Sequence, residues 1–245
     1  MAKSGFGKRS LVTRGVEAMM PDGLEHALDR GLDRALRVQR GAVTSYVARL
    51  RAQPGATPAS VVRALERRYL ASVAAIGAAS GGAAAVPGAG TAASLASGVA
   101  EVAAFVEATA LFTLAVADVH GQRFEDPEAR RALVLTIVLG DLGAAAIGAA
   151  DATGAHWAPL LSRGVNRDSI GRINKTLLKH VATRFGARQG ALLVGRALPF
   201  GIGAGIGAAG NAALARASIQ AARRAFGPPP ATFGPQIVDV LPEIL

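Results

Sequence analysis

Four polar residues in the middle of the sequence are the best candidates for acid–base or metal chemistry: Glu107, Asp118, His120 and Asp141. Glu107 and Asp118 are eleven positions apart, so on one α-helix they share a face but lie about 16 Å apart along its axis. These two carboxylates cannot form a catalytic pair by themselves. Asp118 and His120, acting with Asp141 on the next helix, would form a proton-transfer pair or a metal site.

A structural role for these residues is the interpretation that we favour. Buried carboxylates need partners, and Glu101 and Glu107 would find them in arginines across a helical bundle. His120 would cap a helix end. The sequence has no cysteine, which excludes thiol catalysis and cysteine-based metal sites.

No recognised catalytic motif accompanies the candidates. A formal G-x-G-x-x-G occupies Gly205, Gly207 and Gly210, but it follows Pro199 instead of a strand, and the next acid is Asp239. This pattern does not indicate a dinucleotide site. We therefore expect no cofactor and no metal.

The net charge of +10 is concentrated in two regions. Residues 1–70 contain 13 Lys and Arg against 6 Asp and Glu, and residues 163–196 contain 8 against the single Asp168. Such basic regions attract polyanions, either nucleic acid or an anionic membrane surface. Nucleic acid is the less favoured partner, because no aromatic residues are interleaved with the basic ones for base stacking.

Two groups of basic residues fall on predicted helix faces. Arg30, Arg34 and Arg37 share one face of an amphipathic segment, and Lys175 and Lys179 lie on the outer face of a later one. We expect these five side chains to contact an anionic membrane surface.

Helix start and stop signals divide the whole chain into α-helices, and no segment shows the period-2 alternation of a strand. The predicted elements are an amphipathic segment between Pro21 and Leu50 and helices over 57–79, 91–119, 127–147, 168–181, 192–198 and 201–226. Thr57-Pro58 and Asp126-Pro127 are typical helix starts, with a capping side chain before proline. We predict an all-α, single-domain helical bundle in which the glycine- and alanine-rich helices 91–119 and 127–148 form a central antiparallel hairpin.

The last predicted helix carries four closely spaced glycines: Gly201, Gly203, Gly205 and Gly207. The pairs at a spacing of four let two helix backbones approach closely. Each glycine costs a helix about 0.5–1 kcal/mol relative to alanine, so close packing should offset this cost. We expect all four glycines to serve helix packing, with Gly203 and Gly207 at a helix–helix contact.

Two uncharged segments, Tyr69–Ala100 and 197–215, are long enough to cross a membrane. The first contains only six strongly apolar residues. In the neighbouring helices, an acid such as Asp118 or Asp141 at the middle of the membrane would raise the free energy of insertion by about 2.5–3.5 kcal/mol. We therefore expect no stable transmembrane insertion.

The chain divides into a basic N-terminal segment over 1–20, an all-α domain over 21–228 and an extended tail over 229–245. The N-terminal segment lacks the continuous apolar stretch and cleavage site of a secretory signal. We expect a cytoplasmic protein, either free or peripheral at the inner face of the cell membrane, and we leave homo-oligomer formation open.

Several segments resemble the EcsC protein family. They are Gly88–Leu95, Glu101, Glu107–Leu111, Val119–Gly121, Asp126, Arg130–Leu135, Ile173–Lys175, Leu198–Ala204 and Gly210-Asn211. The resemblance covers about residues 55–228 and depends on the order and spacing of these segments. It implies a bacterial α-helical protein in a family named from a gene beside an ABC transporter. The excess of Arg, Ala and Gly is typical of a GC-rich genome.

The resemblance implies no established reaction and supplies no catalytic residues. We therefore expect a non-enzymatic helical protein that is peripherally associated with a membrane or accessory to a membrane transporter. The alternative is an uncharacterised hydrolase or metal-dependent enzyme that uses the four candidates Glu107, Asp118, His120 and Asp141.

Overall fold

The structure is a computed structural model, and it describes residues 25–26, 28–33, 35–36, 40–83, 91–148, 156–162, 167–196 and 202–234. These residues contain α-helices and no β-strand, which confirms the predicted all-α fold. Residues 28–33 and 35–36 are helical. The further helices are α2 (Arg40–Arg51), α3 (Pro58–Ala83), α4 (Thr91–Val119), α5 (Pro127–Leu139), α6 (Asp141–Ala146), α7 (Ala158–Ser162), α8 (Arg167–Arg196) and α9 (Ile202–Phe226).

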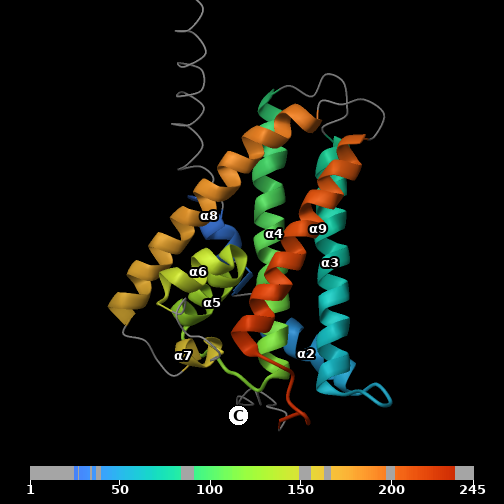
Figure 1. Ribbon diagram of the computed structural model, residues 1–245, viewed down its shortest axis with the longest axis vertical. Helices are drawn as coiled ribbons and strands as arrows, with labels where there is room; N and C mark the ends of the chain where they lie inside the picture. Colours follow the sequence, from blue (N-terminus) through green and yellow to red (C-terminus); the bar gives the residue numbers. More distant parts are fainter. Residues whose placement is uncertain are drawn as a thin grey trace, which may run out of the picture.

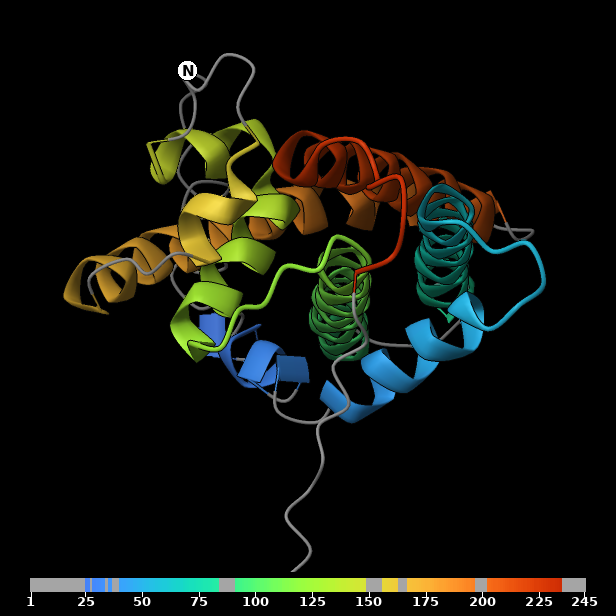
Figure 2. The ribbon, with the colours of Figure 1, turned by 90° about the horizontal axis from the view of Figure 1, so that it is seen from below.

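Helix α4 is the centre of the bundle. It runs antiparallel beside α3, and α9 crosses in front of both (Figure 1). Seen from below, α2 covers one side of α4 while α8 and α9 cover the opposite side (Figure 2). Helices α2, α3, α5, α8 and α9 all contact α4. This arrangement buries apolar residues on more than one face of α4.

The ends of α4 agree with the sequence prediction. The helix stops at Val119 because Gly121 adopts a positive φ of 66°, a conformation that side-chain-bearing residues avoid. The Gln122 amide then donates to the Ala117 carbonyl at 2.9 Å, which satisfies a carbonyl at the helix end.

The helix predicted over 127–147 is interrupted. Asp126 caps α5 as expected, since its side chain accepts from the Glu128 amide at 3.2 Å. The helix ends at Leu139, however, because Gly140 has φ 65° and ψ −124°, and α6 then starts in a new direction. The predicted hairpin partner of α4 is thus shorter than expected, and α3 is the helix that runs alongside α4 (Figure 1).

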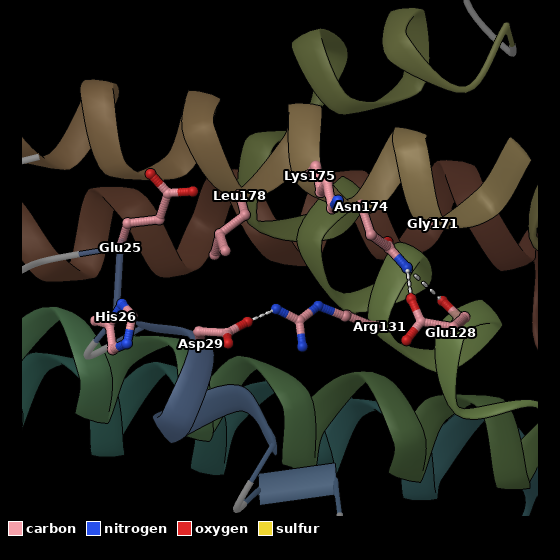
Figure 3. Close-up of a pocket in the computed structure, with 9 residues that line it drawn as sticks. All are labelled: Glu25, His26, Asp29, Glu128, Arg131, Gly171, Asn174, Lys175 and Leu178. Atoms are coloured by element: carbon pink, nitrogen blue, oxygen red, sulfur yellow. Dashed lines mark hydrogen bonds and ion pairs between the residues drawn. The ribbon is translucent and has the colours of Figure 1, made fainter. Parts of the chain in front are cut away.

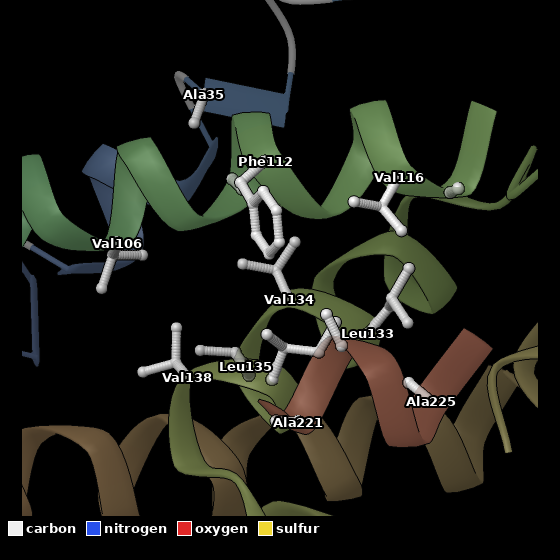
Figure 4. Close-up of a cluster of buried hydrophobic side chains, with 14 of the residues drawn as sticks. Ala35, Val106, Phe112, Val116, Leu133, Val134, Leu135, Val138, Ala221 and Ala225 are labelled. Carbon is white, nitrogen blue, oxygen red and sulfur yellow. The ribbon is translucent and has the colours of Figure 1, made fainter. Parts of the chain in front are cut away.

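The core lies where α4, α5 and α9 meet. Phe112 of α4 points at Val134 of α5, and Ala221 and Ala225 of α9 close the cluster (Figure 4). The side chains of Leu133, Val134 and Leu135 have no exposed surface. Ala221 and Ala225, the residues of α9 in this cluster, are both buried.

Helices α3 and α9 pack with their backbones in contact. A Cβ atom added to Gly207 would overlap the carbonyl oxygen of Gly77, and one added to Gly77 would overlap that of Gly207. Gly207 therefore lies at the expected helix contact. Gly205 differs from the expectation, because it faces open space and is exposed. Gly201 lies outside the described residues, as do the surroundings of Gly203.

Two further segments bear on the sequence predictions. Helix α8 is continuous from Arg167 to Arg196, whereas the sequence suggested a separate short helix over 192–198. Within the described residues, only Val99–Val119 is long and apolar enough to cross a membrane, and just over half of that segment is buried in the protein.

Candidate functional site

Asp118 lies at the end of α4 beside Arg51 of α2. A guanidinium nitrogen of Arg51 is 3.8 Å from the carboxylate and donates to the Asp118 backbone carbonyl at 2.8 Å. Burial raises the pKa of the Asp118 carboxyl, and the charges of Arg51 and Arg123 partly oppose this effect. Asp118 therefore belongs to a contact between α2 and α4.

His120 stabilises the C-terminal end of α4. Its Nδ1 lies 2.8 Å from the carbonyl oxygen of Val116, and its ring centre is 5.3 Å from that of Phe226 in α9. The other ring nitrogen, Nε2, is buried without a hydrogen-bond partner. This placement fits the helix-end role that we favoured for His120.

The candidate residues do not assemble into one site. Asp141, at the start of α6, is exposed and pairs with Arg224 of α9 at 2.9 Å. No hydrogen bond or ion pair joins Asp118, His120 and Asp141 to one another, and Glu107 is half-buried farther along α4. Among the described residues, no three metal-binding side chains lie together.

A different group of polar residues surrounds a pocket of about 750 Å³. The pocket lies between the helical residues near position 25, the start of α5 and the N-terminal half of α8 (Figure 3). Its lining residues come from three distant parts of the chain: Glu25, His26, Asp29, Glu128, Arg131, Gly171, Asn174, Lys175 and Leu178.

Arg131 forms one wall of this pocket. Its guanidinium pairs with Asp29 and, at 2.9 Å, with Asp33, which lies one helical turn farther along. Burial lowers the pKa of the guanidinium from its usual value, but an arginine stays charged throughout the physiological range. The Arg131 charge is therefore already shared by two carboxylates.

Asn174 and Glu128 lie at the end of the pocket away from Glu25 and His26 (Figure 3). The Asn174 amide nitrogen donates to the Glu128 carboxylate at 2.7 Å and to the Glu128 backbone carbonyl at 3.0 Å. Asn174 is only 3% exposed, and its Oδ1 has no hydrogen-bond partner. This oxygen has almost no accessible surface and therefore does not face the open space of the pocket.

The exposed surface of α8 beside this pocket is basic. Arg172, Lys175 and Lys179 are all exposed, and their spacing places them on one side of the helix. Residues 169–185 of α8 contain no acid. Lys175 and Lys179 thus lie on an outer face, as the sequence predicted.

The N-terminal basic group is described only in part. Arg30 is exposed and its Nε donates to the His26 carbonyl at 3.4 Å. Arg34 and Arg37 lie outside the described residues, and so does the basic segment 1–20.

Comparison with known protein families, curated proteins and solved structures finds no match. Two segments that the sequence analysis singled out meet at the pocket. Arg131 belongs to Arg130–Leu135, and Asn174 and Lys175 belong to Ile173–Lys175. The sequence did not place Glu25, Asp29, Glu128 or Arg131 in a site, because they come together only when the N-terminal helical residues and α8 pack beside α5.

Proposed function

We propose that this chain is a non-enzymatic protein that associates peripherally with an anionic membrane surface through the basic face of α8, defined as Arg172, Lys175 and Lys179. The observation that carries this proposal is the exposure of three cations on a face with no acid in residues 169–185. Such a face attracts anionic lipids, and the one acid of α8, Asp168, precedes it by one helical turn.

The expected attraction is moderate. Each Lys or Arg near an anionic leaflet contributes up to about 1 kcal/mol, so three residues give a weak and reversible association. Stable attachment generally needs a second signal. The basic segment 1–20, with Lys3, Lys8, Arg9 and Arg14, is our proposed second signal.

We also propose membership in the EcsC family and, with it, a role accessory to a membrane transporter. The order of the resembling segments supports this proposal. The hydrolase alternative receives no support from the geometry, because Asp118, His120 and Asp141 each have separate partners.

Liposome co-sedimentation tests the membrane proposal. The full chain is mixed with vesicles of phosphatidylcholine alone or with phosphatidylglycerol added. The test variant is Arg172→Glu/Lys175→Glu/Lys179→Glu. The control is Arg63→Glu/Arg67→Glu/Arg216→Glu, which makes the same change in net charge at exposed positions of α3 and α9.

We expect the wild type and the control to sediment with anionic vesicles at low salt, and the α8 variant to remain in solution. Binding should weaken strongly with salt, because the Debye length falls from about 10 Å at 0.1 M to about 3 Å at 1 M. Equal sedimentation of both variants would overturn the role of α8. Equal binding of the wild type to both lipids would overturn the electrostatic mechanism.

A further inference from the structure

We propose that an apolar cavity between α2, α3 and α4 binds a medium-chain fatty acid as its carboxylate anion, with the alkyl chain inside the cavity and the carboxylate on Arg68 and Arg49. The cavity has a volume of about 270 Å³ and lies where α2 runs across α3 and α4 (Figure 2). The inference is independent of the membrane proposal, because no residue of α8 lines this cavity.

The buried wall of the cavity is apolar. It consists mainly of Val43, Leu65, Tyr69 and Phe112. The hydroxyl of Tyr69 lies 2.7 Å from Thr109 Oγ1 and is therefore already bonded. Among the described residues that line the cavity there is no carboxylate. A polar group placed inside would lose its hydrogen bonds to water without replacement, so the interior accepts the apolar part of a ligand.

An alkyl chain suits this wall better than an aromatic ring. Tyr69 and Phe112 stack on each other with their ring centres 4.5 Å apart, so one face of each ring is already covered. The remaining wall is aliphatic, with Val43, Leu65, Leu111 and three alanines. Each CH₂ group that moves from water into such surroundings strengthens binding by about fourfold.

The volume of the cavity limits the length of the chain. A protein cavity of about 150 Å³ holds one benzene molecule, which has six carbon atoms. On the same scale, the cavity of about 270 Å³ holds about ten non-hydrogen atoms. Octanoate is a carboxylate of this size.

Two arginines at the rim provide positive charge for the carboxylate. The guanidinium of Arg68, which lines the cavity, lies 5.0 Å from the ring centre of Tyr46, and that of Arg49 lies 5.9 Å from the same ring centre. Arg68 also donates to the Tyr46 hydroxyl at 3.3 Å. Tyr46 thus holds two like charges close together beside an apolar wall.

Neither guanidinium pairs with a carboxylate in the part of the chain that the structure describes. Arg51, two positions farther along α2, does pair with an acid, Asp118. Arg49 and Arg68 are both exposed and contact only the phenol of Tyr46 in this way. Two neighbouring cations without a counter-charge attract an anion, and a guanidinium can donate two parallel hydrogen bonds to a carboxylate. The rim and the wall together are therefore complementary to a fatty acid anion.

Isothermal titration calorimetry on the full chain tests the proposal with octanoate, below the concentration at which micelles form. We expect one site per chain with a Kd below about 1 mM. Hexanoate should bind about tenfold more weakly, because it has two fewer CH₂ groups. 1-Octanol should also bind about tenfold more weakly, because it lacks the charge, and octyltrimethylammonium should not bind.

Two cavity variants and one control locate the binding. Arg49→Gln/Arg68→Gln should reduce octanoate affinity to that of 1-octanol and leave 1-octanol binding unchanged, because only the charge is lost. Ala108→Phe places a ring in the cavity and should weaken the binding of both ligands by about tenfold or more. Arg63→Gln/Arg67→Gln removes the same number of charges at exposed positions of α3 outside the cavity and should bind like the wild type.

Several results would overturn the proposal. These are no saturable binding of octanoate, equal binding of octyltrimethylammonium, and unchanged affinity in both cavity variants. Tighter binding of 3-phenylpropionate than of octanoate would overturn the choice of an alkyl chain in favour of an aromatic acid. Binding of lysophosphatidylglycerol without binding of octanoate would assign the cavity to a phospholipid instead. A wild-type dimer that Ala108→Phe dissociates, seen by sedimentation velocity, would assign it to a second copy of the chain.

Folding of each variant is established by thermal unfolding followed by circular dichroism. The arginine variant keeps the test decisive if Ala108→Phe does not fold. Vesicle sedimentation of Arg49→Gln/Arg68→Gln should match that of Arg63→Gln/Arg67→Gln, so failure of this proposal is separable from failure of the membrane proposal.

Discussion

Gly77 of α3 and Gly207 of α9 face each other so closely that a methyl group on either would overlap the carbonyl oxygen of the other. The contact also includes Asn211, whose side-chain nitrogen lies 2.7 Å from the position that a Cβ of Gly77 would take. At this contact the backbones of the two helices are therefore so close that only glycine fits between them.

Because of this contact, we predict that alanine has opposite effects on stability at two glycine positions of α9. Gly207→Ala should destabilise the protein by about 1–3 kcal/mol, because α3 and α9 must separate to admit the methyl group. Gly205→Ala should stabilise it by about 0.5–1 kcal/mol, because this exposed helical position has open space around it. Urea unfolding measures both free energies. Equal changes in the two variants would contradict the close contact.

The buried phenol of Tyr69 predicts a loss of stability at alkaline pH. Its oxygen lies 2.7 Å from Thr109 Oγ1, and burial raises its pKa from 10.0 to about 12. Because the folded-state pKa is the higher one, the stabilising contribution is complete below pH 10.0 and is lost as the pH rises towards 12.

Tyr69→Phe should therefore cost about 0.5–1.5 kcal/mol at neutral pH through loss of the hydroxyl hydrogen bonds. The difference between wild type and variant should shrink above pH 10. Unfolding free energies measured at pH 8 and pH 11 test this expectation. A difference that stays constant across this range would show that the phenol ionises as readily in the folded chain as in the unfolded one.

Asp118 predicts a pH dependence of the same sign in the acid range, with stability lost as the pH rises through the folded-state pKa. Burial raises its pKa above 3.8, so ionisation of Asp118 costs the folded state some stability at neutral pH. Asp118→Asn should be more stable than the wild type at pH 7, by up to about 1 kcal/mol, since the side chain is partly exposed and faces Arg51.

The advantage of Asp118→Asn should disappear as the pH falls through the folded-state pKa to below 3.8, where the carboxyl is protonated in both states. The hydrogen bond from Arg51 to the backbone carbonyl of residue 118 does not depend on the side chain and should persist. Melting temperatures of both proteins between pH 3.5 and pH 7 provide the measurement. A variant that is less stable at pH 7 would mean that the attraction to Arg51 exceeds the cost of burial.

We predict that substitution of Arg131 mainly loosens the nearby N-terminal helical residues. Arg131→Lys keeps the charge but replaces a planar fork by a single ammonium, which cannot bridge Asp29 and Asp33 equally well. We expect faster proteolytic cleavage near residues 25–36 with a global unfolding free energy lowered by about 1 kcal/mol. Asp29→Asn/Asp33→Asn should reproduce this cleavage pattern, and Lys175→Met, which leaves the ion pairs intact, should not.

Local signals in the sequence predicted most of the helices. Thr91–Val119 was predicted at both ends because the breaks that flank it, Pro87 to Gly90 and Gly121, act within a few residues of the helix. The break at Gly140 was missed because a single glycine within an apolar run is compatible with a continuous helix. The positive φ of Gly140 accompanies the packing of α6 against Thr136, which the local sequence does not reveal.

The pocket could not have been predicted in the same way. Arg131 is 98 and 102 positions from its two acidic partners, and Asn174 is 46 positions from Glu128. No periodicity connects residues at such separations. The candidate acids Asp118 and Asp141 were proposed together because their helices are adjacent in sequence, but each pairs with an arginine from another helix.

The pairing of Arg131 with two carboxylates also determines how the N-terminal helical residues are aligned. Asp29 and Asp33 are separated by one turn, so both reach the same guanidinium at only one rotation and one axial position of that helix. A shift of one residue would turn both carboxylates about 100° away from α5. Apolar contacts alone tolerate several such alignments. The two ion pairs of Arg131 therefore select one alignment of the N-terminal helical residues on α5.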